Sequence, residues 1–334
     1  AMESILNQTH KNFEFIIVVD GGEDDNFITE NFHDDRIRII KNESNFGLAK
    51  SLNIGLKQCK GKYVFRMDSD DVSLPTRLGV QICYLEENPD VILCASYAKK
   101  IGDKIGIITV EFNSQEDIKC QMLVTNPLIH PSVCIRNTCL KENNLKYNEK
   151  YIYSQDFEFW QQLKNYGEMY VIPKVLLKYR IHHKQISVSK RDVQNKLCKE
   201  LLSQVLKKET DLYSKQNMDC LYVLNTYVAM PLNEKNVFKV DEFIEKLCSD
   251  SLLRQKGYDL KELENILNYK FLILNIKYKM LSYSLKDRKL RKRLINLSNI
   301  MYLLKKIISV IKGYIYCFWT QLLFQLIRRN YAKK

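Results

Sequence analysis

The stretch that decides the fold runs from Gly61 to Leu78: Gly-Lys-Tyr-Val-Phe-Arg-Met-Asp-Ser-Asp-Asp-Val-Ser-Leu-Pro-Thr-Arg-Leu. Its apolar run, residues 63–67, is typical of a short buried strand. Three carboxylates, Asp68, Asp70 and Asp71, follow directly. Acids on an open loop at a strand end offer oxygen ligands to Mg²⁺ or Mn²⁺, which bind substrate phosphates at the same time. The alternative is a solvated turn in which Asp68 or Ser69 caps the helix that Pro75 opens.

The residues upstream of the acids carry a resemblance to a known family. They include Asn45-Phe-Gly-Leu-Ala-Lys-Ser-Leu-Asn53-Ile-Gly55, Phe13-Glu-Phe-Ile-Ile-Val-Val-Asp20-Gly-Gly-Glu-Asp24 and Ser4-Ile-Leu-Asn-Gln-Thr9. In order and spacing, these elements and the acidic stretch resemble the motifs of the family 2 nucleotide-sugar-dependent glycosyltransferases, over residues 1–190. The resemblance implies an α/β protein of GT-A fold, with a mixed central sheet and a helical C-terminal region.

The sequence departs from the family pattern near its start. The family has a strand and a Tyr-Asn loop before the Ser-Ile-Leu helix, whereas this sequence starts at Ala1, inside that helix. We therefore expect a truncated or incompletely recorded sequence, and natural loss of the strand is the alternative. Val19 also replaces the first Asp of a family pair. The resemblance assigns the second, Asp20, to the base or ribose of the nucleotide, and it places Asn45 among the donor-binding residues.

The resemblance also gives roles to the three acids. Asp70 corresponds to the ligand that holds Mn²⁺ or Mg²⁺ against the donor diphosphate. Asp68 corresponds to a residue that contacts the ribose or a metal-bound water. For Asp71, a role in the site and a role as a helix cap both stay open.

The catalytic base is expected in the segment Tyr153-Ser-Gln-Asp-Phe-Glu-Phe-Trp160. It resembles the family's Asp-x-x-x-Trp segment, in which the Asp accepts the proton of the attacking acceptor hydroxyl in an inverting reaction. Asp156 is therefore the expected base. The alternative is that Asp156 is an N-terminal helix cap. Glu158, two positions on, lies on another helix face and is a poorer choice.

Two further segments carry histidines. Tyr179-Arg-Ile-His-His-Lys-Gln-Ile-Ser187 resembles a family segment in which Arg180, His182 or Lys184 neutralises the diphosphate. A histidine there can also bind metal, although a structural role is an equal alternative for His182. His130 occupies a place where the family has a polar residue near the donor sugar, and a structural role at the start of a strand is again the alternative.

Composition limits the class of protein. With 334 residues, 46% of them hydrophobic, the chain forms one large globular domain and an appendage. None of its ten cysteines lies at Cys-x-x-Cys spacing, so we expect reduced thiols in a cytoplasmic protein. We find no signal peptide at this N-terminus.

The net charge of +13 is concentrated in the tail. Residues 1–190 hold 24 basic and 25 acidic residues, whereas residues 286–334 hold 13 basic and one acidic. The tail contains an aromatic-rich apolar stretch, Ile307 to Ile327. We expect an amphipathic helix on an anionic membrane surface at the inner face of the cell membrane. A membrane span, a core helix and, more weakly, nucleic-acid binding are the alternatives.

Short β-rich runs alternate with helical segments from Phe13 to Val133, which is typical of a sheet with crossover helices. We expect strands at Phe13–Val19, Arg36–Lys41, Lys62–Met67, Val91–Tyr97, Ile105–Glu111 and Ser132–Arg136, and helices at Gly47–Cys59, Pro75–Glu87 and Ser114–Val124. A hairpin turn is expected at Gly102-Asp103. Past Ser189 the pattern is helical, so we divide the chain into a transferase domain, 1–190, and a helical region, 191–334.

The sequence thus predicts an inverting, metal-dependent glycosyltransferase. It would move a sugar from a nucleotide donor, a UDP-hexose or UDP-N-acetylhexosamine, to a growing lipid-linked glycan of the bacterial surface, such as lipopolysaccharide, O-antigen or capsule. The rivals are a non-catalytic protein that keeps the sheet without binding donor, and a nucleic-acid binder that acts through the basic tail.

Overall fold

The structure, a computed structural model, describes residues 1–22, 24–110, 114–183, 185, 189–225, 233, 236–277, 284, 287 and 290. The expected membrane helix at 307–327 lies outside these residues. The chain divides into two compact units, which are described separately. The first comprises Ala1–Ile108 and Leu128–Leu197, and the second Thr109–Pro127 and Cys198–Lys334.

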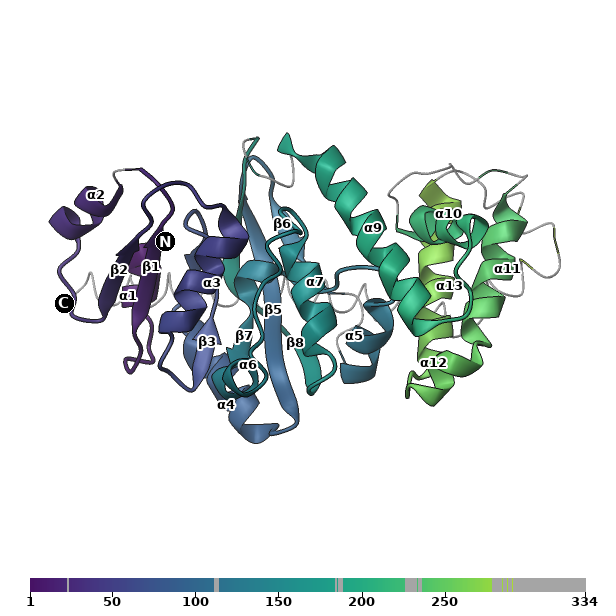
Figure 1. Cartoon of the computed structure of the whole chain (residues 1–334), viewed down its shortest axis with the longest axis horizontal. Helices are drawn as coiled ribbons and strands as arrows, with labels where there is room; N and C mark the ends of the chain where they lie inside the picture. Colours follow the sequence, from purple (N-terminus) through teal and green to yellow (C-terminus); the bar gives the residue numbers. More distant parts are fainter. Residues whose placement is uncertain are drawn as a thin grey trace, which may run out of the picture. The chain divides into compact units, whose positions relative to one another are not determined.

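A mixed sheet forms the centre of the first unit (Figure 1). Its strand order is β3-β7-β5-β8-β4, and β6 pairs with the outer part of β5. The two longest strands, β5 and β8, run parallel, and the other described pairs of this sheet are antiparallel. The strands are β3 (Tyr63–Phe65), β4 (Val72–Ser73), β5 (Val91–Gly102), β6 (Gly106–Ile108), β7 (Cys134–Arg136) and β8 (Glu168–Ile181).

A separate parallel pair, β1 (Phe15–Val19) and β2 (Ile37–Lys41), stands beside this sheet in the first unit. Helix α3 (Leu48–Gln58) packs on β1, where a Cβ added at Gly55 would lie 3.4 Å from Val18. The other helices of the unit are α1 (Met2–Leu6), α2 (Asp24–Asn31), α4 (Arg77–Glu87), α6 (Asn137–Glu142) and α7 (Gln155–Leu163), with a 3-10 turn at His130–Ser132.

The core of the first unit lies along β5. Residues 91–98 are all buried, since α4 packs on β5 and strands β7 and β8 pair with its two edges. Phe157, Phe159 and Trp160 of α7 are also fully buried. A continuous apolar run is typical of such a central strand, and the strand expected at Val91–Tyr97 is confirmed, extended to Gly102.

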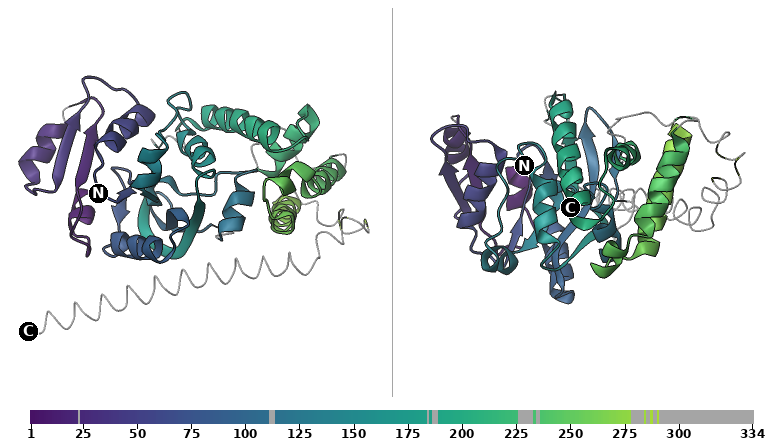
Figure 2. Two further views of the ribbon diagram at one scale, coloured as in Figure 1. Left: turned by 60° about the horizontal axis from the view of Figure 1, so that its bottom comes forward. Right: turned by 45° about the vertical axis from the view of Figure 1, so that its right-hand side comes forward.

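Strand β8, which pairs with β5 in the first unit (seen from two further sides in Figure 2), was not expected from the sequence. The reason is Pro173, which cannot donate a ladder hydrogen bond. The pairing with β5 shifts in register at this point, from Ser96–Ile172 to Tyr97–Val175, and leaves Pro173 and Lys174 exposed. The shift accommodates the proline within a long strand.

The second unit is helical among its described residues, as expected. Helix α9 (Arg191–Glu209) starts in the first unit and continues into this one. The others are α5 (Gln115–Gln121), α10 (Lys215–Leu224), α11 (Val237–Cys248), α12 (Ser251–Gln255) and α13 (Leu260–Lys277). Among the described helices, none combines the length and the apolarity that crossing a bilayer requires.

Helix α5 belongs to the second unit, whereas the division at residue 190 assigned it to the first. Its residues Ile118 and Cys120 are buried, and α5 packs against α13. Lys119 donates hydrogen bonds of 3.0 Å to the main-chain oxygens of Lys256 and Gly257. These contacts join segments about 140 residues apart, which local sequence patterns do not reveal.

Candidate active site

The acid loop, residues 66–71, connects β3 to β4 and brings three carboxylates together. One oxygen from each of Asp68, Asp70 and Asp71 lies within 4.8 Å of the other two. The loop is closed by a hydrogen bond of 3.3 Å from the Asp71 N–H to the Asp68 main-chain oxygen. Helix α4 begins only at Arg77, with Thr76 at its N-cap. The alternative that one of these residues caps the next helix is therefore wrong.

Asp68 is held by the residue two positions before it. Both terminal nitrogens of Arg66 donate to the Asp68 carboxylate, and the Nη1–Oδ2 distance is 3.0 Å. Arg66 is itself 9% exposed, so this two-point contact lies against the interior of the unit. Such a paired geometry fixes the orientation of the carboxylate. No motif in the sequence marks Arg66 for this role.

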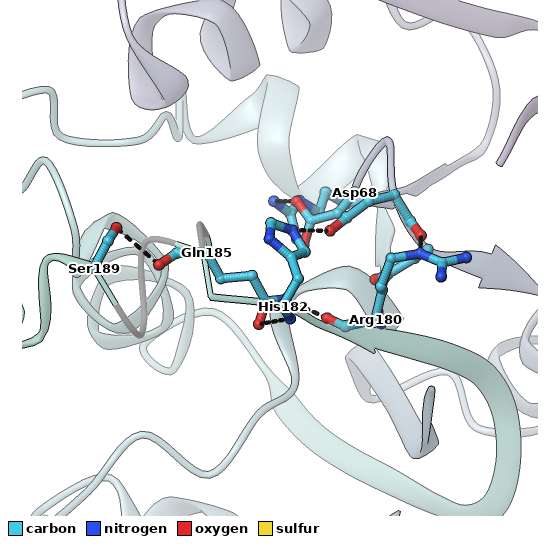
Figure 3. A network of polar contacts seen from close by, with 8 residues as sticks. Asp68, Arg180, His182, Gln185 and Ser189 are labelled. Atoms are coloured by element: carbon cyan, nitrogen blue, oxygen red, sulfur yellow. Dashed lines mark hydrogen bonds and ion pairs between the residues drawn. The ribbon is translucent and has the colours of Figure 1, made fainter. Parts of the chain in front are cut away.

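Asp70 contacts two residues at the carboxyl end of β8, Arg180 and His182. Both are labelled in Figure 3. His182 Nε2 lies 3.0 Å from Asp70 Oδ2. Arg180 Nε donates a hydrogen bond of 2.8 Å to the main-chain oxygen of Asp70. The structure therefore brings together three residues that the sequence analysis took from segments 110 residues apart.

Asp71 faces the interior. Its side chain is fully buried, and its Oδ1 accepts the N–H of Arg180 at 2.8 Å. Its Oδ2 has no hydrogen-bond partner among the described residues. Burial raises the pKa of Asp71 to about 7, and the charges of Asp68 and Asp70 act in the same direction, against the Arg180 hydrogen bond.

Gln185 forms two hydrogen bonds with residues at the end of β8. Gln185 donates through Nε2 to the main-chain oxygen of Arg180, and its Oε1 accepts the N–H of His182 at 3.4 Å. Ser189 Oγ donates to the main-chain oxygen of Gln185 at 2.9 Å, and Figure 3 shows these residues in line beside His182. Gln185 thus bonds to the main chain of both residues whose side chains contact Asp70. Lys184, the third expected cation, lies outside the described residues.

Asp20 organises the loop before α3. Its carboxylate accepts hydrogen bonds from Asn42 Nδ2 at 2.9 Å and from the N–H groups of Phe46 and Gly47 at 2.8 and 2.9 Å. Burial by itself raises the pKa of Asp20, but these hydrogen bonds outweigh it and hold the pKa below its usual value. Asn45 is exposed on the same loop, and its Oδ1 accepts the Gly47 N–H at 3.1 Å.

Replacing Asp20 by alanine is expected to lower the free energy of unfolding by about 2 kcal/mol, because a charged acceptor of three hydrogen bonds is lost. Urea denaturation of both proteins measures this difference. Asp35→Ala, on the exposed turn before β2, is the matched control and should change the value by less than about 0.5 kcal/mol. An equally small effect at Asp20 would show that the loop holds its shape without the carboxylate.

Asp156 lies in the first turn of α7, half-buried. The N-cap of this helix is Ser154, so the alternative that Asp156 is the cap is wrong. The pKa of the buried Tyr147 hydroxyl is raised, first by burial and further by the charges of Asp156 and Asp68. The charges of both carboxylates therefore act in the same direction on this hydroxyl.

A buried group of polar and aromatic side chains connects segments that are far apart in the sequence. Asn53 exchanges two hydrogen bonds with the main chain of Tyr147, at 2.8 and 2.9 Å. His130 Nε2 lies 2.9 Å from the Tyr147 hydroxyl, and its ring packs edge-on against Trp160. Burial, with the charge of Arg66, holds the pKa of His130 well below its usual value. His130 is thus buried in the interior, where burial favours its neutral form.

Comparison with known proteins gives a consistent result. The family model described as "Glycosyl transferase family 2" matches residues 1–134. An uncharacterized glycosyltransferase of Methanocaldococcus jannaschii, MJ1057, is 38% identical over 57% of this chain and 68% of its own length. The amylovoran biosynthesis glycosyltransferase AmsE of Erwinia amylovora is 29% identical over 54% of this chain and 68% of its own.

Two further comparisons extend over more of the chain. An uncharacterized glycosyltransferase of Haemophilus influenzae is 29% identical over 83% of this chain and 88% of its own. Among solved structures, S. aureus TarS 1–349 in complex with UDP-GlcNAc is similar with a TM-score of 0.53 and 17% identity, covering 89% of this chain and 84% of that chain. At this identity the likeness concerns the fold.

Proposed function

The chain belongs to glycosyltransferase family 2 and has the GT-A fold, and on this basis we propose that it transfers a sugar from a nucleotide diphosphate donor with inversion at the anomeric carbon. The observation that carries the proposal is the acid loop. Three carboxylates that converge within 4.8 Å form a donor set suited to a hard divalent cation. The buried Asp71 Oδ2, without a hydrogen-bond partner among the described residues, adds to this fit.

In the proposed site, Asp70 is the ligand of Mn²⁺ or Mg²⁺, and Asp68 contacts the ribose or a metal-bound water. When bound, the metal neutralises charge on the diphosphate leaving group. Arg66 fixes the orientation of Asp68, so the Asp68 carboxylate is already engaged on one side. This supports the division of roles between Asp68 and Asp70. Asp71 holds the acid loop against β8 through the N–H of Arg180.

Arg180 and His182 are proposed to bind the diphosphate. Both lie at the carboxyl end of β8 and contact Asp70, the proposed metal ligand, which supports a role for them beside the leaving diphosphate. Asp20 and Asn45 are proposed to contact the nucleotide. Asp20 would do so from a carboxylate whose position the loop before α3 already holds.

Asp156 is proposed as the base that accepts the acceptor hydroxyl proton. It is half-buried at the start of α7, and its charge reaches the same tyrosine as that of Asp68. A half-buried carboxylate can take the proton as the hydroxyl attacks the sugar from the face opposite the diphosphate.

The acceptor and the cellular setting are further parts of the proposal. The UDP and UDP-GlcNAc complexes of TarS favour a UDP-hexose or UDP-N-acetylhexosamine donor, and AmsE is named for amylovoran biosynthesis. We therefore propose a growing, lipid-linked bacterial surface glycan as the acceptor. Residues 1–190 would form the catalytic part, and the basic tail would hold the enzyme at the inner face of the membrane.

A donor-hydrolysis screen tests this function. UDP, GDP and dTDP sugars are incubated with the full chain in Mn²⁺, in Mg²⁺ and after treatment with EDTA. We expect hydrolysis of a UDP sugar that falls at least about 100-fold in EDTA and returns when metal is added, because the cation neutralises the leaving group. Metal-independent hydrolysis would contradict the metal assignment. The absence of both hydrolysis and metal-dependent UDP binding by calorimetry would favour the non-catalytic rival.

A further inference from the structure

The hairpin formed by β5 and β6 ends in an exposed apolar side chain. Ile105, at its tip, is 89% exposed, and the adjacent Lys104 is exposed as well. Gly102 has a φ of 87°, and a Cβ there would collide with the main-chain oxygen of Ile181. The Asp103 N–H also donates to this oxygen at 2.9 Å. The base of the hairpin is therefore fixed against the end of β8, the strand that carries Arg180 and that His182 follows.

The register of the sheet shows which side chains share a face with the site. Ile101 pairs with Arg180 across β5 and β8, and Lys99 pairs with Lys178 in the same way. Lys99 also pairs with Ile107 across β5 and β6. Paired residues point to the same side of a sheet, and so do residues two positions apart. One face, half-buried, thus runs from Arg180 at the acid loop through lysines and isoleucines to the hairpin.

The hairpin and the adjoining part of β8 carry a net positive charge, although residues 1–190 as a whole are nearly neutral. Residues 99–108 contain three lysines and one acid, Asp103. Lys178 and Arg180 of β8 lie beside them on the shared face. By contrast, residues 1–190 as a whole hold 24 basic and 25 acidic residues. Lysines around an exposed isoleucine match an anionic, partly apolar surface, because electrostatic attraction and apolar insertion act together there.

We propose that the β5–β6 hairpin docks on the surface of an anionic phospholipid bilayer, with Ile105 inserted among the lipids and Lys99 and Lys104 near the headgroups. This contact is separate from the basic tail. It rests on the proposed function in one respect, since a bilayer beside the acid loop would present a lipid-linked acceptor to it. The rigid link between Asp103 and Ile181 would then set the orientation of the site toward the membrane.

The test places a fluorescent reporter at the tip in the full chain. Ile105→Trp is mixed with vesicles of phosphatidylglycerol and phosphatidylcholine that carry bromine on their acyl chains. We expect a blue-shifted emission and added quenching that the parent protein lacks, because the indole enters the acyl region. Phe27→Trp is the matched control, since Phe27 is 62% exposed on α2 of the same unit, and it should add no quenched component.

A second arm measures charge. Lys104→Gln should lower the vesicle partition coefficient about fivefold at low salt, whereas the exposed Lys57→Gln on α3 should not. Equal quenching for the two tryptophan variants, or an unchanged partition coefficient for Lys104→Gln, would overturn the proposal. Donor hydrolysis in solution distinguishes its failure from that of the proposed function, because both hairpin variants should hydrolyse donor at the parent rate without lipid.

Discussion

Replacing Asp70 by alanine is expected to lower sugar transfer by about a thousandfold or more and to remove metal-dependent nucleotide binding. The carboxylate is the proposed metal ligand, and alanine offers no oxygen in its place. The fold should be retained, because the link from Arg180 goes to the main-chain oxygen of Asp70. The lost contact to His182 joins two side chains that are each about one-third exposed, so its removal costs about 1 kcal/mol or less.

Initial rates at saturating Mn²⁺, calorimetry with UDP and urea denaturation measure the three parts of this prediction. Asp103→Ala removes a carboxylate from the exposed hairpin of the same unit and serves as the control for loss of charge. It should keep metal-dependent UDP binding. If Asp70→Ala retains most of its activity at saturating Mn²⁺, Asp70 is not the metal ligand.

Replacing Asp156 by asparagine is expected to lower kcat about 10²–10⁴-fold and to leave donor affinity unchanged. A base acts on the proton of the acceptor, so its loss affects turnover and not nucleotide binding. The substitution keeps the size of the side chain in the first turn of α7, which limits any effect on the helix.

Glu158→Gln is the matched control, since it makes the same chemical change two positions along α7. The pKa of Glu158 is raised by burial, and its carboxylate is engaged by Gln162, at 2.8 Å from Oε2, and by Asn148. We expect turnover within about threefold of the parent, since this side chain takes no part in the proposed chemistry. Equal losses of UDP-sugar binding and turnover in Asp156→Asn would instead indicate a structural role.

The family and the GT-A fold were predictable because their motifs are contiguous in the sequence. The strand–acid–helix order around Asp70 needs only a stretch of 18 residues, Gly61–Leu78, and the structure reproduces it as β3, the acid loop, β4 and α4. The hairpin at Gly102 was predictable for the same reason. Strand β8 was not, since Pro173 interrupts its pattern and only the register shift against β5 makes room for it.

The residues of the candidate site were more predictable from the sequence than the contacts between them. Asp70, Arg180 and His182 were each named from a local motif, but their mutual contacts depend on the pairing of β4 with β8. Arg66 and Gln185 had no motif signal, because their roles consist of hydrogen bonds to other site residues. The assigned roles of Asp70, Asp156 and the donor-binding residues stay predictions until the variants are measured.

The contacts between the acid loop and β8 have a consequence for protein synthesis. Asp71 can bond to the N–H of Arg180 only after some 110 further residues have left the ribosome. Until then, the buried carboxylate and its neighbours lack the strand that covers them, and pairing across such a sequence separation is slow. The nascent chain should therefore emerge with an unformed acid loop, and chaperone demand should be greatest before β8 is complete.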